Sequence, residues 1–268
     1  MIEIFSKENK LVKHITKLSN DRKYRYKTKQ FLIEGLRLVR EAYITNAKLS
    51  YAFVTREFYE KNKDFVDNIA GAAKECYIIS PAIAKQISET QSPQGVFCVC
   101  EMRDNQLYAS DIKSGGKYLV LCSLQDPGNM GTIIRTADAF SLDGVILSDD
   151  CVDIYSPKVI RSTMGSCFRV NLIISKKENM EDTIRALKNK EIKVYAAALS
   201  EKSRCVTEVN MDGGCAFVIG NEGNGLEKEI IDCCTEAVII PMNEKTQSLN
   251  AAVAGSVLMW EMFKATMK

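Results

Sequence analysis

Residues 117–139, KYLVLCSLQDPGNMGTIIRTADA, contain the clearest indication of the fold class. The stretch opens with an apolar run, Tyr118–Leu124, of the length and composition of a buried strand. A polar turn containing glycine and asparagine follows, and apolar residues at helical spacing then predict a helix over Thr132–Phe140. The stretch therefore predicts a strand, a turn and a helix in direct succession, which is the repeating unit of an α/β sheet.

The same alternation continues toward the C-terminus. Further apolar runs predict strands at Val145–Leu147, Leu172–Ile174, Val194–Leu199, Ala216–Ile219 and Ala237–Ile240. Helices are predicted between and after them at Ser156–Gly165, Met180–Lys190, Leu226–Cys233 and Ser248–Lys264. Continuous apolar strands alternating with helices predict a parallel sheet covered on both faces. In such folds ligands bind outside the carboxyl ends of the strands, so residues that directly follow a strand are site candidates.

The first 105 residues follow a less regular pattern. Short strands are predicted at Tyr51–Val54, Cys76–Ile79 and Val96–Cys100, and Phe31–Gly35 predicts another, with a helix from Leu36. We expect a small α/β domain over residues 1–105, a polar linker over 106–116 and a larger α/β domain over 117–268.

The composition indicates a globular protein from a reducing compartment. A hydrophobic content of 46% supplies a sizeable core. The ten cysteines lie mostly inside apolar runs, and their spacing fits neither a disulfide framework nor a zinc site. His14 is the single histidine, which argues against an imidazole-rich metal site. No apolar run reaches the roughly 18 residues that a membrane span needs. We therefore expect a cytoplasmic protein without a metal.

Basic residues are concentrated in one window near the N-terminus. Lys10 to Lys29 contains eight lysines and arginines against Asp21 alone. Within it, two tyrosines interleave with four cations: Arg22, Lys23, Arg25 and Lys27. Such a patch suits RNA phosphates, with the tyrosines able to stack on bases. The alternative interpretation is a solvated helical face.

Two further loops follow predicted strands. Gly220–Leu226 has three glycines within six residues, which let a backbone approach a ligand closely. Its carboxylate, Glu222, could fix an arginine through a bidentate contact. In the other loop Pro241 ends a strand, and Ser248 is expected to cap the last helix. A cap alone does not account for Asn250.

Together the three loops resemble, in order, the three motifs of the SpoU-type RNA 2′-O-methyltransferases of the SPOUT superfamily. The matches are the Asn-x-Gly-x-x-x-Arg of residues 129–135, the Gly-Asn-Glu-Gly-x-Gly-Leu of 220–226, and the Ile-Pro-Met of 240–242 with Ser-Leu-Asn at 248–250. The first half is similar to that family's ribosomal-protein-like RNA-binding domain, on the basic window, Phe31–Gly35 and Ser92–Val96.

The resemblance implies a fold and a cofactor. It implies that the C-terminal domain is a parallel sheet with a deep trefoil knot, an exception to the rule that connections do not thread loops. It also implies a homodimer formed through this domain, and S-adenosyl-L-methionine held largely by backbone groups. By position, the implied cofactor pocket is formed by Leu199, Gly220, Ile240, Met242, Ser248 and Leu249.

The resemblance further implies methyl transfer to a ribose 2′-hydroxyl of RNA. The N-terminal recognition domain favours ribosomal RNA, of the large subunit, over transfer RNA. Arg135 matches the catalytic arginine, and we expect it to orient the acceptor rather than act as a base, because a guanidinium keeps its proton in proteins. The residues expected to hold Arg135 and the acceptor are Asn129, Glu222, Ser248 and Asn250.

One position departs from the family pattern. Glu244 stands where the family usually has glycine, and a glutamate is costly there if the backbone needs a positive φ. This departure keeps open an inactive RNA-binding protein of the same fold. A nucleotide-dependent oxidoreductase is a weaker alternative, because the first loop has only part of the dinucleotide glycine fingerprint.

Overall fold

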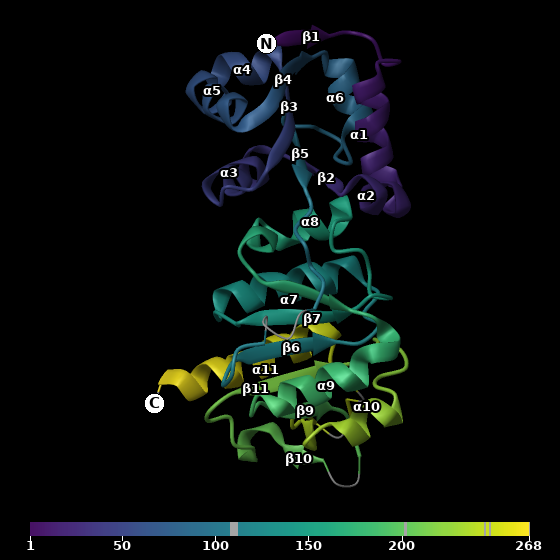
Figure 1. The fold of residues 1–268 in the computed structure, drawn as a ribbon, viewed down its shortest axis with the longest axis vertical. Coiled ribbons are helices and arrows are strands. Elements are labelled where there is room, and N and C mark those ends of the chain that lie inside the picture. Colours follow the sequence, from purple (N-terminus) through teal and green to yellow (C-terminus); the bar gives the residue numbers. More distant parts are fainter. Residues whose placement is uncertain (108–111, 201–202, 244, 247, 268) are drawn as a thin grey trace. The chain divides into compact units, whose positions relative to one another are not determined.

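The computed structural model describes residues 1–107, 112–200, 203–243, 245–246 and 248–267, which form two compact units (Figure 1). The N-terminal unit consists of Met1–Asp104 and Asp153–Phe168, and the C-terminal unit of Asn105–Val152 and Arg169–Lys268. Glu244 lies outside the described residues, as do residues 108–111 of the predicted linker.

The described part of the N-terminal unit has a mixed five-stranded sheet in the order β1-β4-β3-β5-β2. Its strands are β1 (Ile2–Ile4), β2 (Gln30–Glu34), β3 (Leu49–Thr55), β4 (Ala73–Ile79) and β5 (Val96–Glu101). The pairs β1–β4 and β3–β4 are parallel, whereas β5 runs antiparallel to β2 and β3. The four strands predicted from the sequence are confirmed, and β1 was not predicted.

The helices of this unit are amphipathic and cover its sheet. They are α1 (Lys10–Asn20), α2 (Arg22–Thr28), α3 (Leu36–Ile44), α4 (Arg56–Lys61), α5 (Lys63–Ala72) and α6 (Pro81–Ile87). Val12, Ile15 and Leu18 of α1 are fully buried and belong to one apolar cluster with Phe53 and Phe97 of the sheet. A fully buried side chain of this size stabilises the fold by about 1.5–3 kcal/mol.

The two N-terminal segments that carried the family resemblance are hydrogen-bonded together. Gly35 has φ 95°, a conformation that favours glycine, and α3 begins directly after it, as predicted. The first amide of that helix, on Leu36, donates to Gln94 Oε1 (2.8 Å). The Glu34 carboxylate accepts from the hydroxyls of Ser88 (2.6 Å) and Thr90 (2.7 Å). These contacts fix the loop before β5 beside the start of α3.

Residues 153–168 belong to the N-terminal unit although they lie in the chain between two strands of the C-terminal sheet. They contain α8 (Pro157–Thr163) and the 3₁₀ turn η2 (Ser166–Phe168). The ring of Phe31 on β2 lies 4.7 Å from that of Tyr155 and 6.3 Å from that of Phe168. The helix predicted at 156–165 is therefore present, but it packs with the first hundred residues rather than with the rest of 117–268.

The described part of the C-terminal unit has a seven-stranded sheet in the order β10-β12-β9-β11-β6-β7-β8, and neighbouring strands in it pair in parallel. Its strands are β6 (Lys117–Leu121), β7 (Gly144–Ser148), β8 (Leu172–Ser175), β9 (Lys193–Ala197), β10 (Arg204–Cys205), β11 (Cys215–Ile219) and β12 (Glu236–Ile239). The predicted parallel sheet is confirmed. The short edge strand β10 was not predicted.

Helices cover both faces of this sheet, as predicted. They are α7 (Pro127–Ala139), α9 (Met180–Asn189), α10 (Lys228–Cys233) and α11 (Ala251–Lys264), with 3₁₀ turns η3 (Lys177–Asn179), η4 (Val206–Glu208) and η5 (Ala265–Met267). Ile184 of α9 and Ile230 of α10 pack with Val120 and Val218 of the sheet. On the other face, Gly255 of α11 lies close to side chains of α7 and β11. Among the described residues, none of the helices has the length and apolar character needed to cross a membrane.

Candidate active site

Three loops of the C-terminal unit leave the same edge of its sheet. Because β6, β11 and β12 are parallel, the loops that follow them start on one side, the carboxyl edge. The first loop is residues 122–126 after β6, the second is 220–227 after β11, and the third is 240–250 after β12.

Side-chain hydrogen bonds join the start of α7, which follows the first loop, to the second and third loops. Asn129, in the first turn of α7, donates from Nδ2 to Glu222 Oε1 of the second loop (3.1 Å). Asn250, at the end of the third loop, donates from Nδ2 to Asn129 Oδ1 (2.9 Å). We name this set the Glu222–Asn129–Asn250 chain. It brings together three of the five predicted catalytic residues, from positions up to 121 residues apart.

Glu222 is the anionic end of this chain. Its carboxylate also accepts from the backbone amides of Asp126 (3.0 Å) and Gln125 (3.2 Å). Desolvation raises the pKa of Glu222, but these amide donors and Asn129 outweigh it, so the pKa lies below its ordinary value. Within the described residues the partners of Glu222 are the two amides of the first loop and Asn129, and the contact with an arginine stays a prediction.

Asn250, rather than Ser248, caps the last helix. Its Oδ1 accepts from the amides of Ala252 (2.9 Å) and Val253 (3.3 Å), and α11 begins at Ala251. The predicted cap at Ser248 is corrected by two residues, and Ser248 is exposed. Asparagine serves both purposes because its oxygen can cap while its amino group donates to Asn129.

The second loop is a tight turn that requires glycine. Asn221 and Gly225 exchange two backbone hydrogen bonds (3.0 and 2.9 Å), and Gly225 has φ 67°. A Cβ added to Gly220 would stand 2.2 Å from the carbonyl carbon of Gly225. The backbone strands of the turn are therefore too close at Gly220 for any side chain.

Arg135 stands apart from the Glu222–Asn129–Asn250 chain. It lies on α7 six residues after Asn129, which places it about a third of a turn away around the helix. Its side chain is exposed and forms no hydrogen bond or ion pair with any of the described residues. The helix itself starts at Pro127, capped by Asp126, five residues earlier than predicted.

The residues expected at the cofactor follow three neighbouring strands. Ala197 of β9 pairs with Val238 of β12, and Ala196 pairs with Val218 of β11, so positions two residues further along are level with one another. This places Leu199 level with Ile240, and Gly220 level with Ala198, one residue before Leu199. Leu199 and Met242 are 86% and 43% exposed, and Leu249 is half-buried. Exposed apolar side chains beside a glycine-lined backbone suit a ligand with apolar and hydrogen-bonding parts.

Within the basic window, the structure contradicts the prediction that Arg25 binds RNA. Its guanidinium forms an ion pair with Asp153 (2.6 Å) and donates to the carbonyl of Leu18 (2.6 Å); the Arg25 and Asp153 side chains are 5% and 6% exposed. A buried arginine with these partners does not reach an RNA phosphate. Lys23, Lys27 and Arg22 are exposed, and Arg22 lies over the ring of Tyr26 (5.6 Å).

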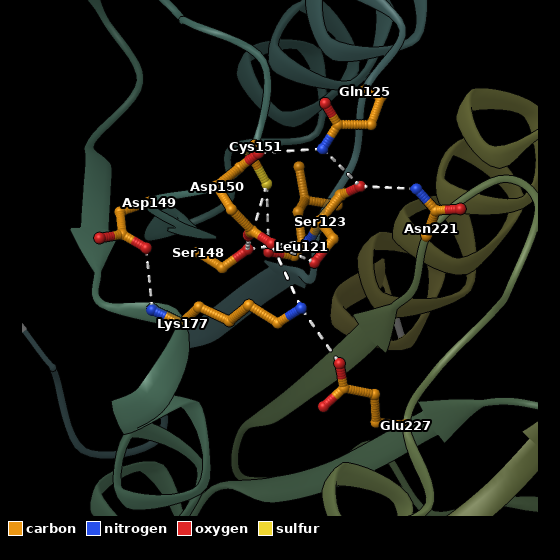
Figure 2. Close-up of polar contacts among 10 residues, drawn as sticks. All are labelled: Leu121, Ser123, Gln125, Ser148, Asp149, Asp150, Cys151, Lys177, Asn221 and Glu227. Carbon is orange, nitrogen blue, oxygen red and sulfur yellow. Dashed lines mark hydrogen bonds and ion pairs between the residues drawn. The ribbon is translucent and has the colours of Figure 1, made fainter.

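A polar cluster beside the first loop was missed from the sequence. Figure 2 shows Ser123, Ser148, Asp150 and Lys177 converging at the carboxyl ends of β6, β7 and β8. The cluster borders a cavity of about 210 Å³ whose lining includes Asn221 of the second loop. Serines and aspartates in separate loops carry no pattern that predicts their meeting, because only the strand order brings them together.

Comparisons with known proteins identify the family of both halves of the chain. Residues 116–260 match the SpoU rRNA methylase family, and residues 9–98 match the MRM3-like substrate binding domain. The chain is 32% identical to the 23S rRNA (guanosine(2553)-2′-O)-methyltransferase RlmP of Bacillus subtilis, over 98% of this chain and 99% of that protein.

Solved structures give the same result. The AdoMet-bound rRNA methyltransferase of Sinorhizobium meliloti superposes with a TM-score of 0.88 and 28% identity, over 99% of this chain and 98% of that one. A putative RNA methyltransferase of the TrmH family from Porphyromonas gingivalis superposes with a TM-score of 0.78 and 28% identity, over 95% and 97%. The chain belongs to the SpoU rRNA methylase family.

Proposed function

We propose that the protein transfers a methyl group from S-adenosyl-L-methionine to a ribose 2′-hydroxyl of RNA, releasing S-adenosylhomocysteine and the hydroxyl proton, with ribosomal RNA of the large subunit as the substrate. The observation that carries the proposal is the Glu222–Asn129–Asn250 chain, which joins all three family motifs. The likeness to an rRNA 2′-O-methyltransferase along the whole chain supports it. The test is a map of ribose methylation across total RNA from cells with and without the gene. One 23S rRNA site lost on deletion is the expected result, and an unchanged map would contradict the proposal.

The cofactor would lie at the ends of β9, β11 and β12. Leu199, Met242 and Leu249 would contact its apolar parts, and the backbone at Gly220 and Ile240 would bind its polar groups. Ser248, which is exposed and free of the capping role, would contribute a hydroxyl. S-adenosyl-L-methionine supplies an electrophilic methyl group when bound. The protein's part is to hold the acceptor hydroxyl against it in the correct geometry.

Replacing Gly220 by alanine is expected to abolish tight cofactor binding. The new Cβ would overlap the Gly225 carbonyl carbon, so the turn must open. Overpacking of this kind costs about 1–3 kcal/mol, or roughly fivefold to over a hundredfold in affinity if it falls on the bound state. Calorimetric titration with S-adenosylhomocysteine measures this. The matched control is Gly223→Ala, whose Cβ would meet only Asn221 Oδ1 at 3.5 Å. Equal affinities in both variants would contradict the assignment.

The ribose hydroxyl would be oriented by Arg135 and the Glu222–Asn129–Asn250 chain. Arg135 would donate to the acceptor oxygen and an adjacent phosphate, stabilising the negative charge that develops as the methyl group is transferred. Arg135 is exposed and is not hydrogen-bonded to the Glu222–Asn129–Asn250 chain. This supports a homodimer in which each acceptor site receives Arg135 from the partner subunit. The oligomeric state in solution, measured by light scattering, tests the dimer, and a monomer at working concentration would contradict it.

The exposed lysines of the basic window would bind RNA phosphates. Lys23→Ala combined with Lys27→Ala is expected to weaken RNA binding and to flatten its salt dependence, by roughly 0.7–0.9 in the log–log slope for each phosphate that is no longer neutralised. Cofactor affinity should stay constant. Filter binding at several salt concentrations measures the slope. Lys63→Ala with Lys85→Ala, two exposed lysines elsewhere in the same unit, is the control. Equal slopes in the two double variants would show that the basic window is a solvated helical face that does not bind RNA.

Three further features belong to the same proposal. The C-terminal unit would be a trefoil-knotted domain. Residues 1–105, together with the segment 153–168 that belongs to the same unit, would recognise the RNA.

The protein would act in the cytoplasm, which the ten free thiols support. The inactive alternative rested on Glu244 alone, and methyl transfer in vitro by the purified protein distinguishes the two functions.

A further inference from the structure

Ser123 adopts a backbone conformation that favours glycine. It follows β6 directly, and its φ is 59°, in the left-handed region. A residue with a Cβ is disfavoured there and persists where its surroundings hold it in place. Ser123 stands two residues before Gln125, whose amide donates to Glu222, so its conformation sets the direction of the first loop.

One carboxylate holds this conformation. Ser123 Oγ donates to Asp150 Oδ2 (2.7 Å), and Ser148 Oγ donates to Asp150 Oδ1 (2.5 Å). The Ser123 amide in turn donates to Ser148 Oγ (2.8 Å). Asp150 thus fixes the Ser123 side chain directly and, through Ser148, fixes its backbone (Figure 2). Lys177 Nζ lies 3.4 Å from the same carboxylate and 3.1 Å from Glu227.

The Ser123 carbonyl accepts hydrogen bonds from the first loop and from the second loop, which contains Glu222. It accepts from Asn221 Nδ2 (2.9 Å) of the second loop and from Gln125 Nε2 (3.0 Å) of the first. Asn221 immediately precedes Glu222, and its Oδ1 accepts from the amides of Gly223 (2.9 Å) and Asn224 (3.1 Å). A change in the Ser123 turn would therefore move Glu222 and the amides that bind it relative to each other.

We propose that Ser123 and Asp150 are positioning residues for methyl transfer: Asp150 holds Ser123 in its left-handed turn, and that turn aligns the two loops on Glu222. The proposal rests on the proposed function. Neither residue belongs to the three family motifs or to the groups expected at the acceptor or the cofactor. Their contribution is to hold the side chains of the Glu222–Asn129–Asn250 chain in the correct relative positions.

Asp150→Ala is expected to lower kcat roughly tenfold to a hundredfold, the size of effect that a small misplacement of reacting groups produces. The KM for RNA should change by less than about threefold, because the substrate-binding unit is untouched. Adding Ser123→Gly to Asp150→Ala should restore most of kcat, since glycine adopts this φ without a hydroxyl partner. Asp150→Asn, which keeps one acceptor oxygen and gains a donor, should lie between the alanine variant and wild type.

Single-turnover methylation and thermal unfolding are measured for each variant. The matched control is Glu227→Gln, which weakens the other ion pair of Lys177 and leaves Asp150 and Ser123 intact; its kcat should stay within about twofold. Folded Asp150→Ala with wild-type kcat, or no recovery in the double variant, would overturn the proposal. If Asp150→Ala does not fold, Ser123→Ala, which removes only the hydroxyl, takes its place with the same expected fall.

Amide hydrogen exchange separates this inference from the proposed function. The amides of Gln125 and Asp126 are bound by Glu222, so they should exchange faster in Asp150→Ala and return toward wild type in the double variant. This readout needs no RNA and no methyl transfer. A wild-type protein that methylates no RNA would refute the function, whereas unchanged exchange at these amides would refute the positioning role.

Discussion

Arg135→Ala abolishes methyl transfer and leaves cofactor affinity within about twofold: this is the expected result with the largest effect on activity. Arg135 lies on α7 and not in the loops at Gly220 and Met242, so its removal should not disturb the cofactor. Loss of one preorganised donor to a developing negative charge costs about 10²–10³ in kcat. Single-turnover methylation at saturating cofactor measures the loss.

Arg135→Lys separates charge from geometry. Lysine keeps the positive charge but lacks the planar fork that donates two parallel hydrogen bonds. If orientation through two simultaneous bonds is the role of Arg135, the lysine variant should lose on the order of a hundredfold in kcat. A lysine variant with most of the wild-type rate would show that charge suffices. Wild-type rates in the alanine variant would remove Arg135 from the reaction and direct attention to Asn129.

Mixing two inactive variants tests whether the arginine acts across a dimer. Arg135→Ala and Glu222→Gln each damage one part of the acceptor site. If Arg135 serves the partner's site, mixed dimers contain one site with both parts intact, and activity should return on mixing. Absence of any recovery, with subunit exchange verified, would mean that Arg135 acts within its own subunit.

Arg25→Met is expected to have the largest effect on stability. The variant leaves the Asp153 carboxylate buried without its cation, a change that typically costs about 3–5 kcal/mol. For a unit of this size the melting temperature should fall by on the order of 10 °C. Differential scanning calorimetry measures the shift. Lys23→Met, an exposed neighbour in the same helix, is the control and should change stability by less than about 0.5 kcal/mol.

The double variant Arg25→Met with Asp153→Leu identifies the cause. Replacing both members of a buried pair by apolar side chains is often neutral or stabilising, so much of the lost stability should return. RNA affinity should follow the folded fraction. A loss of RNA affinity in fully folded Arg25→Met would contradict the structural role and restore Arg25 to the RNA-binding surface.

Arg25 shows where prediction from the sequence ends. The cations of α2 alternate with tyrosines, and a pattern of charges does not show which side of a short helix faces inward. That side was decided by Asp153, which lies 128 residues further along the chain. Local patterns predicted the C-terminal strands and most helices well, because each depends on its own run of apolar residues.

The site could be predicted in part for the same reason. Asn129, Glu222 and Asn250 stand in the loops that follow apolar runs or at the helix starts that end those loops, so a parallel sheet places them on one edge. The hydrogen bond between Ser123 and Asp150 depends on the backbone conformation after β6 and on the neighbouring end of β7, and neither has a signal in residue types. The cap at Asn250 was misplaced to Ser248 because both residue types are good caps and only the geometry of the loop distinguishes them.

The N-terminal unit is built from two separate segments of the chain, and this has a consequence for its synthesis on the ribosome. When residue 104 has left the exit tunnel, Phe31 and Arg25 still lack the partners supplied by residues 153–168. At ordinary translation rates those residues follow several seconds later, after β6, α7 and β7 have been made. During this interval the side chains of Phe31 and Arg25, which are buried in the complete protein, stay exposed on the nascent first unit. A chain that ends between residues 104 and 153 is therefore expected to expose apolar surface that the complete protein covers, the kind of surface that chaperones bind.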